Sequence, residues 1–209
     1  MILNNSVGQL IKNSLIKSYT YSQYRDLMAQ MLIQGMSTGH QQSEALTHYS
    51  ILNQVRMNRL DRTLTIPVKI ENKFQNLKNK YIFLVFTESW CGDAAQTMPV
   101  INKITLLKGF NYRVILRDDN EELMSYFLTN GSKSIPKLLI LDAETQDFVA
   151  SWGPRPEDAV QLVNDLKVKY GSFTDEAKTE LQKWYLYDKG ISTMLEIYDI
   201  LHKAENHEE

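Results

Sequence analysis

Cys91 is the residue of this sequence that is best placed for chemistry. It follows the apolar run Tyr81–Phe86, which predicts a buried strand, and it precedes a segment with helical periodicity. A thiol at the start of a helix meets unpaired backbone N–H groups and the positive end of the helix dipole, which stabilise its thiolate. The carboxylate of Asp93, two residues on, disfavours a second negative charge. We therefore expect modest net activation of the thiol.

The lack of a second cysteine limits the reactions that are open to Cys91. It is the single cysteine among 209 residues, so no disulfide can form within the chain. The four histidines show no metal-ligand spacing, and we expect no metal site and no resident cofactor. In the remaining monothiol chemistry, the thiolate attacks a protein or peptide disulfide, or a peroxide, and glutathione or another external thiol resolves the adduct. This hypothesis requires a sulfur that is open to solvent.

The segments around Cys91 predict a sheet with helical crossovers. From residue 81 strands and helices alternate in the order βαβαββα, and a short polar turn predicts antiparallel pairing of the last two strands. We therefore predict an α/β fold over residues 76–171, with a central mixed sheet flanked by helices. The expected strands are Tyr81–Thr87, Tyr112–Leu116, Lys137–Leu141 and Phe148–Trp152, and the expected helices are Asp93–Leu107, Asn120–Leu128 and Pro156–Tyr170.

Helical patterns also precede and follow this central part. We expect residues 1–75 to form an N-terminal helical extension that packs on the core, and residues 172–209 to form a C-terminal one with two helices separated near Gly190. The elements expected in the first extension are helices over Tyr21–Gln34 and Ser43–Leu60, an edge strand over Thr63–Ile70 that Pro67 interrupts, and a short helix over Asn72–Lys80.

Four landmarks in the central part resemble the thioredoxin superfamily. They are the W-C-G string at Trp90-Cys91-Gly92, the helix proline Pro99, the pair Ile135-Pro136 ahead of a strand, and Gly153. The longer string W-C-G-D-A-A-Q stands where thioredoxins have W-C-G-P-C, and it is similar to a bacterial group of thioredoxin-like proteins with helical extensions at both ends. The resemblance implies a thioredoxin-like three-layer fold.

The resemblance also implies a groove beside Cys91. In the family, the backbone of the residue before a cis-proline, here Ile135, pairs with an extended peptide or with glutathione. The residues that the resemblance places around this groove are Trp90, Gly92, Asp93, Ile135, Pro136 and Gly153.

Departures from the family pattern bear most directly on function. Ala94 stands where the family has its resolving cysteine, so the chain is not a dithiol disulfide reductase. Val85 stands where the family has a buried acid that assists proton transfer. Two hypotheses follow from these departures: monothiol redox or mixed-disulfide chemistry through Cys91, and a non-catalytic module that binds a peptide or a partner protein in the same groove. Whether the chain is an enzyme stays open.

Two arginines could support the site electrostatically. Arg117 lies at the end of the expected strand Tyr112–Leu116, which neighbours the strand that leads to Cys91. The carboxyl ends of parallel strands lie at one edge of a sheet, so Arg117 can approach Cys91 or pair with Asp93. Arg155 follows Gly153 and can reach the same edge, where its guanidinium can bind a carboxylate or another anion.

Composition excludes several other classes of protein. Hydrophobic residues make up 43% of the chain, and the net charge of −2 comes from interspersed acids and bases, so we expect neither a nucleic-acid partner nor a membrane partner. The run Tyr81–Phe86 is too short to span a bilayer, and the first residues show no basic leader. We therefore expect a cytoplasmic location, while the oligomeric state stays open.

Overall fold

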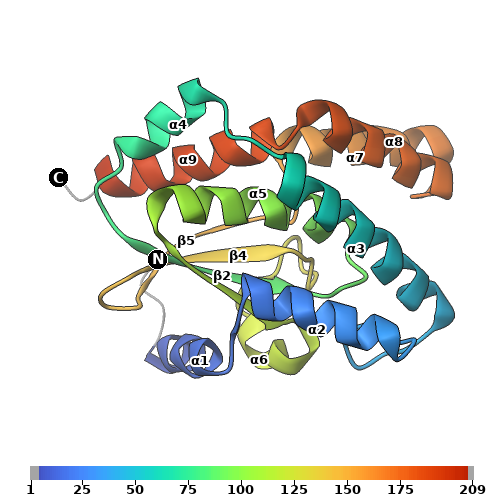
Figure 1. Ribbon diagram of the computed structural model, residues 1–209, viewed down its shortest axis with the longest axis horizontal. Helices are drawn as coiled ribbons and strands as arrows, with labels where there is room; N and C mark the ends of the chain where they lie inside the picture. The colour runs from blue at the N-terminus through green and yellow to red at the C-terminus, as the bar shows by residue number, and fades with distance from the viewer. Residues whose placement is uncertain (1–4, 207–209) are drawn as a thin grey trace.

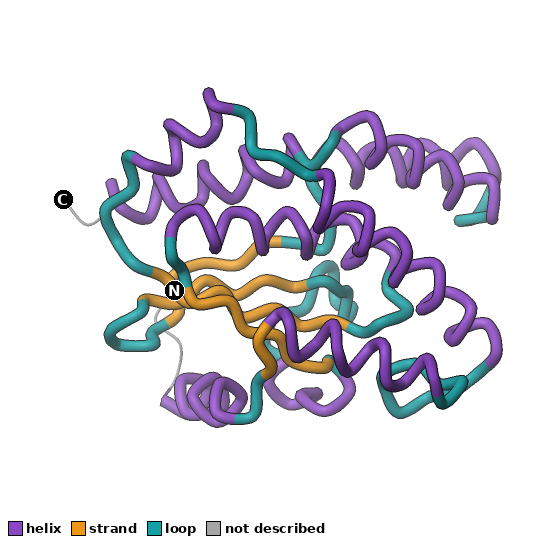
Figure 2. Tube along the Cα trace, in the orientation of Figure 1, coloured by secondary structure: helices purple, strands orange, loops and turns teal. Residues whose placement is uncertain are grey.

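The computed structural model describes residues 5–206, so the first four residues and the last three of the two expected extensions lie outside it. A five-stranded sheet lies at its centre (Figures 1 and 2). Its strand order is β1-β3-β2-β4-β5, with β2 and β3 parallel and every other neighbouring pair antiparallel. The strands are β1 (Tyr19–Thr20), β2 (Tyr81–Thr87), β3 (Asn111–Leu116), β4 (Lys137–Asp142) and β5 (Phe148–Trp152).

Helices cover both faces of this sheet. On one face α5 packs against α3, α4 and α9, while α1 and α6 pack together on the other (Figure 1). The predicted α/β fold, with a mixed sheet flanked by helices and further helices at both ends, is confirmed. The helices are α1 (Asn5–Ile16), α2 (Tyr21–Ile33), α3 (Glu44–Thr63), α4 (Val68–Gln75), α5 (Gly92–Lys108), α6 (Glu121–Met124), α7 (Glu157–Tyr170), α8 (Asp175–Asp188) and α9 (Ile191–Asn206).

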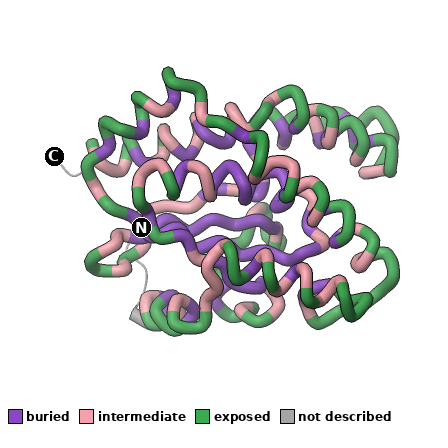
Figure 3. The backbone as a smooth tube through the Cα atoms, in the orientation of Figure 1, coloured by how far each residue is buried: buried purple, intermediate pink, exposed green. Residues whose placement is uncertain are grey.

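The core is built around β2. Every residue of Tyr81–Thr87 is buried, because helices cover both faces of the strand and β3 and β4 flank its two edges. A strand that is buried on both faces reads as a continuous apolar run rather than an alternating one. Figure 3 shows the buried backbone concentrated in the sheet and in α5, with exposed residues on the outer helices. The end of β2 therefore holds Cys91 on a rigid base.

A second, smaller hydrophobic cluster lies between α7 and α8. Its buried members are Ala159 and Val163 of α7 and Leu181 and Tyr185 of α8, and it is separate from the main core. The two helices thus form a hairpin that packs on itself. Figure 1 shows this hairpin extending from the body on the side where β2 ends. The inner side of α8 reaches the motif region, as described below.

The predicted edge strand over Thr63–Ile70 is wrong. Thr63 is the last residue of α3, and Leu64–Pro67 is a link between two helices. Pro67 occupies the N-cap position of α4, where the fixed φ of proline suits the entry to a helix and its missing N–H costs nothing. The sequence analysis also missed α1 and β1 and made α6 too long.

No helix in the described part of the chain combines the length and the apolarity that crossing a membrane requires.

Candidate functional site

Cys91 occupies the N-cap position of α5, directly after the loop that follows β2. The backbone N–H of Ala94 donates to its Sγ at 3.4 Å, and the thiol donates to the carbonyl oxygen of Ile135 at 3.2 Å. Only 7% of the residue is exposed. The monothiol hypothesis requires a sulfur that is open to solvent, and the structure shows instead a buried thiol with a fixed hydrogen-bond partner.

The surroundings of Cys91 hold the thiol in its neutral form. Burial raises the pKa of Cys91 to about 12, and the nearby carboxylate of Asp93 adds to that increase. The backbone amides at the start of α5 and the guanidinium of Arg155 lower the pKa, but burial outweighs both. The predicted modest activation of the thiol is therefore wrong, because the pKa of Cys91 is raised and not lowered. The prediction considered the helix terminus but not the burial of the sulfur.

Asp93 is buried and forms an ion pair with Arg155, with 2.6 Å between Oδ2 and Nη2. The hydroxyl of Tyr185, on α8, donates to its other carboxylate oxygen at 2.9 Å. Burial raises the pKa of Asp93, and both partners oppose that shift. Arg155 thus binds a carboxylate as the sequence analysis allowed, and that carboxylate belongs to the motif itself.

Arg117 does not pair with Asp93, contrary to one of the two expectations for it. Its Nη2 lies 2.7 Å from Oδ1 of Asp118, and its guanidinium stacks over the ring of Trp90 at 5.0 Å from the ring centroid. Its ion-pair partner is therefore the adjacent residue Asp118. Arg117 thus supports the indole beside Cys91 rather than the charge of the motif helix.

The loop ahead of β4 supplies the opposite side of the site. The Ile135–Pro136 peptide bond is cis, and the carbonyl of Ile135 faces the sulfur of Cys91. Gly153 has φ +108°, and a Cβ on it would lie 2.4 Å from the carbonyl oxygen of Pro136. Only glycine allows these two backbone segments to approach so closely.

The loop that carries the motif is fixed by the helices that precede the sheet. Ser89 donates its backbone N–H to Thr38 Oγ1 at 2.7 Å, and its hydroxyl is within hydrogen-bond distance of the Thr38 amide and the Ser50 hydroxyl. The side-chain amide of Asn53 donates to the Ser89 carbonyl at 2.9 Å. All of these groups are buried, so the network positions Trp90 and Cys91 through satisfied hydrogen bonds.

Glu88 is a buried acid that the sequence analysis did not single out. Its Oε1 accepts the backbone N–H of Asp118 at 3.1 Å, while its Oε2 is buried and has no hydrogen-bond partner in the described part of the chain. Burial raises the pKa of Glu88, and hydrogen bonds from Thr38 and Asp118 oppose the shift. Ionisation of Glu88 at neutral pH therefore lowers the stability of the fold beneath the site.

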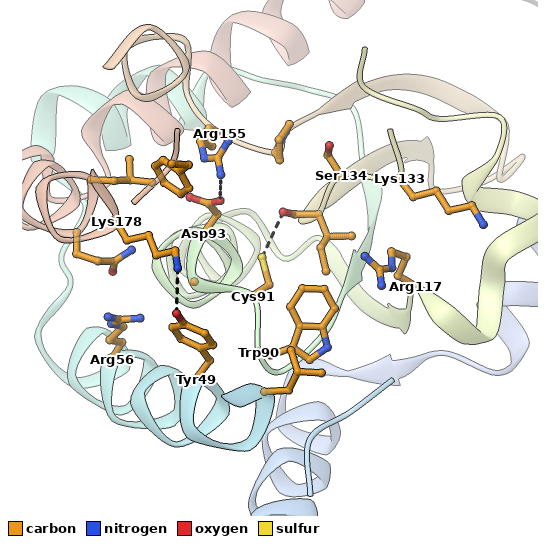
Figure 4. Close-up of a pocket in the computed structure, with 17 residues that line it drawn as sticks. Tyr49, Arg56, Trp90, Cys91, Asp93, Arg117, Lys133, Ser134, Arg155 and Lys178 are labelled. Atoms are coloured by element: carbon orange, nitrogen blue, oxygen red, sulfur yellow. Dashed lines mark hydrogen bonds and ion pairs between the residues drawn. The ribbon is translucent and has the colours of Figure 1, made fainter. Parts of the chain in front are cut away.

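A cavity of about 460 Å³ opens over Cys91, within the size range of small-ligand sites. Figure 4 shows Cys91 at its centre, with Trp90 and Arg117 to one side and Arg56, Tyr49 and Lys178 across from them. Among the predicted site residues, Pro136 and Gly153 are not part of the cavity wall. The predicted residues that line it are Trp90, Cys91, Gly92, Asp93, Arg117, Ile135 and Arg155.

Two walls of this cavity come from outside the central part of the chain. Leu46, Tyr49 and Arg56 of α3 form one, and Phe173 with three residues of α8 forms the other. The ammonium of Lys178 donates to the Tyr49 hydroxyl at 3.1 Å, so a hydrogen bond joins the two walls. The helical extensions therefore turn an open groove into a pocket.

The pocket residues of α3 were not predicted, because the buried positions of that helix do not form an apolar stripe. Apolar residues at helical spacing would suggest an inner face that includes Leu52 and Val55, yet these two residues are 37% and 64% exposed. The buried positions are Ser50, Asn53 and Met57, which have helical spacing. Two of the three are polar, and a search for apolar periodicity does not single them out.

No group of three or more histidine, cysteine, aspartate or glutamate side chains in residues 5–206 is arranged to hold a metal ion.

The chain is similar to known proteins in family and in fold. A family model described as thioredoxin matches residues 39–167. A crystal structure of a protein of unknown function from Pseudomonas aeruginosa is 17% identical with a TM-score of 0.57, and the match covers 89% of this chain and 99% of that one. The crystal structure of an HIV epitope-scaffold is also 17% identical, with a TM-score of 0.56 and coverage of 88% and 99%. No curated protein matches the sequence.

Proposed function

This chain belongs to the thioredoxin family, and on that premise we propose that it binds an extended peptide segment of a partner protein in the pocket at Cys91. It uses the thioredoxin fold as a binding scaffold rather than as a disulfide reductase. The observation that carries this proposal is the buried, neutral thiol of Cys91, which donates to the Ile135 carbonyl. The site rather than the fold supports this function, because the same fold hosts many activities.

Protonation of the thiol argues for binding over redox chemistry. The thiolate is the attacking species in thiol–disulfide exchange. Because burial raises its pKa to about 12, Cys91 is almost entirely protonated at pH 7. Asp93, the acid nearest in sequence, is engaged by Arg155 and Tyr185 and is not free to act as a base. Ala94 supplies no second sulfur.

One observation favours the monothiol hypothesis, namely the N–H of Ala94 that points at Sγ. Such a contact stabilises a thiolate at a helix terminus. The same sulfur is desolvated, however, and the effect of burial on its pKa is larger than the effect of the amide. The second candidate function is therefore weaker, and the experiment below tests both.

A peptide backbone has a partner ready in the Ile135 loop. Within residues 5–206 no hydrogen bond uses the backbone N–H of Ile135, which lies two residues ahead of β4 and lines the pocket. An extended segment can pair with such a free backbone group in the manner of an added strand. The walls formed by Trp90, Phe173 and Leu181 are apolar, so they favour apolar side chains on the bound segment.

The test uses ¹⁵N-labelled protein and N-acetylated tripeptides that end in leucine or phenylalanine. We expect millimolar peptide to shift the Ile135 amide and the Trp90 indole resonances, both in the wild type and in Cys91→Ser. The Trp152 indole, which donates to Glu196 at 2.7 Å, serves as an internal control that does not move.

In a second experiment, the protein is incubated with glutathione disulfide at pH 7 and its mass is measured by mass spectrometry. We expect no mixed disulfide in the folded protein and a mixed disulfide in the urea-unfolded control. Rapid adduct formation on the folded protein would overturn the binding proposal in favour of monothiol chemistry, as would a failure of every peptide to shift Ile135.

A further inference from the structure

Arg56 is the cation of the pocket that lacks an acidic partner. Its Nη1 donates to Asn53 Oδ1 at 2.9 Å, and no carboxylate in the described part of the chain lies within ion-pair distance of it. The side chain is half-buried. Removing a guanidinium from water without a counter-charge costs free energy that a bound anion can offset. A bound anion could therefore supply the counter-charge that Arg56 lacks.

The other four cations of the pocket wall are each paired with an acid. Within residues 5–206, five cations line the cavity and four have acidic partners, so one positive charge remains unmatched there. One unmatched charge fits a carboxylate, which carries one negative charge, better than it fits a phosphate monoester, which carries nearly two at pH 7. The four pairs are Arg117–Asp118, Lys133–Glu121, Arg155–Asp93 and Lys178–Asp175.

Arg56 lies over the first residue of α5. Its Nη1 is 3.8 Å from the place where a Cβ on Gly92 would sit, and Nε2 of Gln182 is 3.6 Å from the same point. The Oε1 of Gln182 accepts from Gln96 at 2.7 Å, which fixes the amide so that Nε2 is the end facing Gly92. Two donors from opposite walls thus converge on the positive end of a 17-residue helix.

The two walls meet beside this point. The hydrogen bond from Lys178 to the Tyr49 hydroxyl ties α8 to α3 near Arg56, as Figure 4 shows. Because this hydrogen bond closes the pocket near Arg56, a bound peptide that ends at Arg56 fits better than one that continues past it.

We propose that the pocket recognises the free C-terminal carboxylate of a peptide with an apolar last residue, and that Arg56 and Gln182 bind this carboxylate. The proposal rests on the peptide-binding function proposed above and narrows its ligand to chain ends. A guanidinium that binds a carboxylate through two parallel N–H groups gives both affinity and orientation. The last side chain of the peptide then lies among the apolar groups of the pocket.

The experiment compares one N-acetylated tripeptide ending in leucine in two forms, the free acid and the C-terminal amide. Dissociation constants are measured by NMR titration of the Ile135 amide. We expect the acid to bind at least about tenfold more tightly than the amide, since a charge-assisted contact is lost in the amide. Arg56→Gln should remove this preference. The matched control Arg62→Gln, an exposed arginine of the same helix, should keep it.

Each alternative outcome overturns a different part of the proposal. Equal binding of acid and amide would overturn carboxylate recognition and leave the peptide-binding function standing, whereas no binding of either would overturn the function itself. A preference that survives Arg56→Gln would overturn the assignment to Arg56. Isocaproate carries the same side chain and carboxylate without a peptide backbone, so binding as tight as that of the tripeptide would overturn recognition of a chain end.

Folding of the Arg56 variant is checked independently. Asn53 connects Arg56 to Ser89, so a disturbed network would shift the Ser89 amide in the absence of ligand. Arg56→Lys keeps the charge and gives a second variant, for which we expect partial retention of the acid preference because an ammonium binds carboxylates without the bidentate geometry.

Discussion

Asp93 is buried and forms an ion pair with the half-buried Arg155, with 2.6 Å between Oδ2 and Nη2, and this pair joins α5 to the loop that follows β5. Removing one member leaves an unpaired charge in the protein interior. We predict that Arg155→Met lowers the free energy of unfolding by about 3–5 kcal/mol, measured by urea denaturation. The double variant Asp93→Asn with Arg155→Met should recover much of that loss. A loss below about 1 kcal/mol in the single variant would contradict the structure.

The thiol of Cys91 should titrate far above neutral pH. Because burial raises its pKa to about 12, we expect the rate of iodoacetamide alkylation to rise about tenfold for each pH unit between pH 7 and pH 10, without a plateau. Asp93→Asn removes a nearby negative charge and should increase the rate at pH 8. A plateau beginning below pH 8 would show an activated thiol and contradict this prediction.

The same shift affects stability at alkaline pH. The folded state keeps the Cys91 proton at pH values where the unfolded chain has lost it, so the folded state binds more protons and stability falls as pH rises above about 8.5. Cys91→Ala removes this proton. We predict that its free energy of unfolding, measured by urea denaturation, falls less than that of the wild type between pH 8 and pH 10. Parallel pH profiles for the two proteins would contradict the burial of this thiol.

Glu88 should make the protein less stable at neutral pH than an amide would. Burial raises the pKa of Glu88, so the folded state holds its proton more tightly than the unfolded chain, and stability falls as pH rises from the ordinary glutamate value through the raised one. We predict that Glu88→Gln is more stable than the wild type by about 1 kcal/mol at pH 7 and that the difference disappears near pH 4. The exposed Glu122→Gln is the control, and a constant difference at both pH values would refute the assignment.

Two glycines offer a matched test of the close approach at the Ile135 loop. Gly171 has φ +75° and open space around it, so Gly171→Ala should cost about 1–2 kcal/mol for its backbone conformation alone. Gly153→Ala adds a clash of the new Cβ with the carbonyl of Pro136 and should cost at least about 3 kcal/mol. Thermal unfolding of both variants measures the difference. Equal losses would mean that the two backbone segments are farther apart than described.

Local patterns predicted much of the fold. The uniform apolar run of β2, the helix that begins after Cys91 and the antiparallel pairing of β4 with β5 each depend on a short stretch of sequence. The strand predicted over Thr63–Ile70 failed because a proline between two helices resembles a proline in an edge strand. A proline between two helices and a proline in an edge strand both have short sequence patterns, so the neighbouring residues did not distinguish the two.

The state of the site depends on contacts between distant segments, which a single sequence does not reveal. Asp93 pairs with Arg155, whereas Arg117 pairs with its neighbour Asp118. The burial of Cys91 depends on the Ile135 loop, 44 residues away, which faces its sulfur. Position at a helix terminus was therefore readable from the sequence, whereas solvent access to the sulfur was not.

The two walls of the pocket lie on either side of strands β2 to β5 in the chain, α3 before them and α8 after them. During synthesis the ribosome releases α3, the motif and the Ile135 loop well before α8, so a growing chain presents the site with one side missing. A complete pocket therefore requires α8 to pack beside the helix that begins after Cys91, in addition to the folding of the sheet.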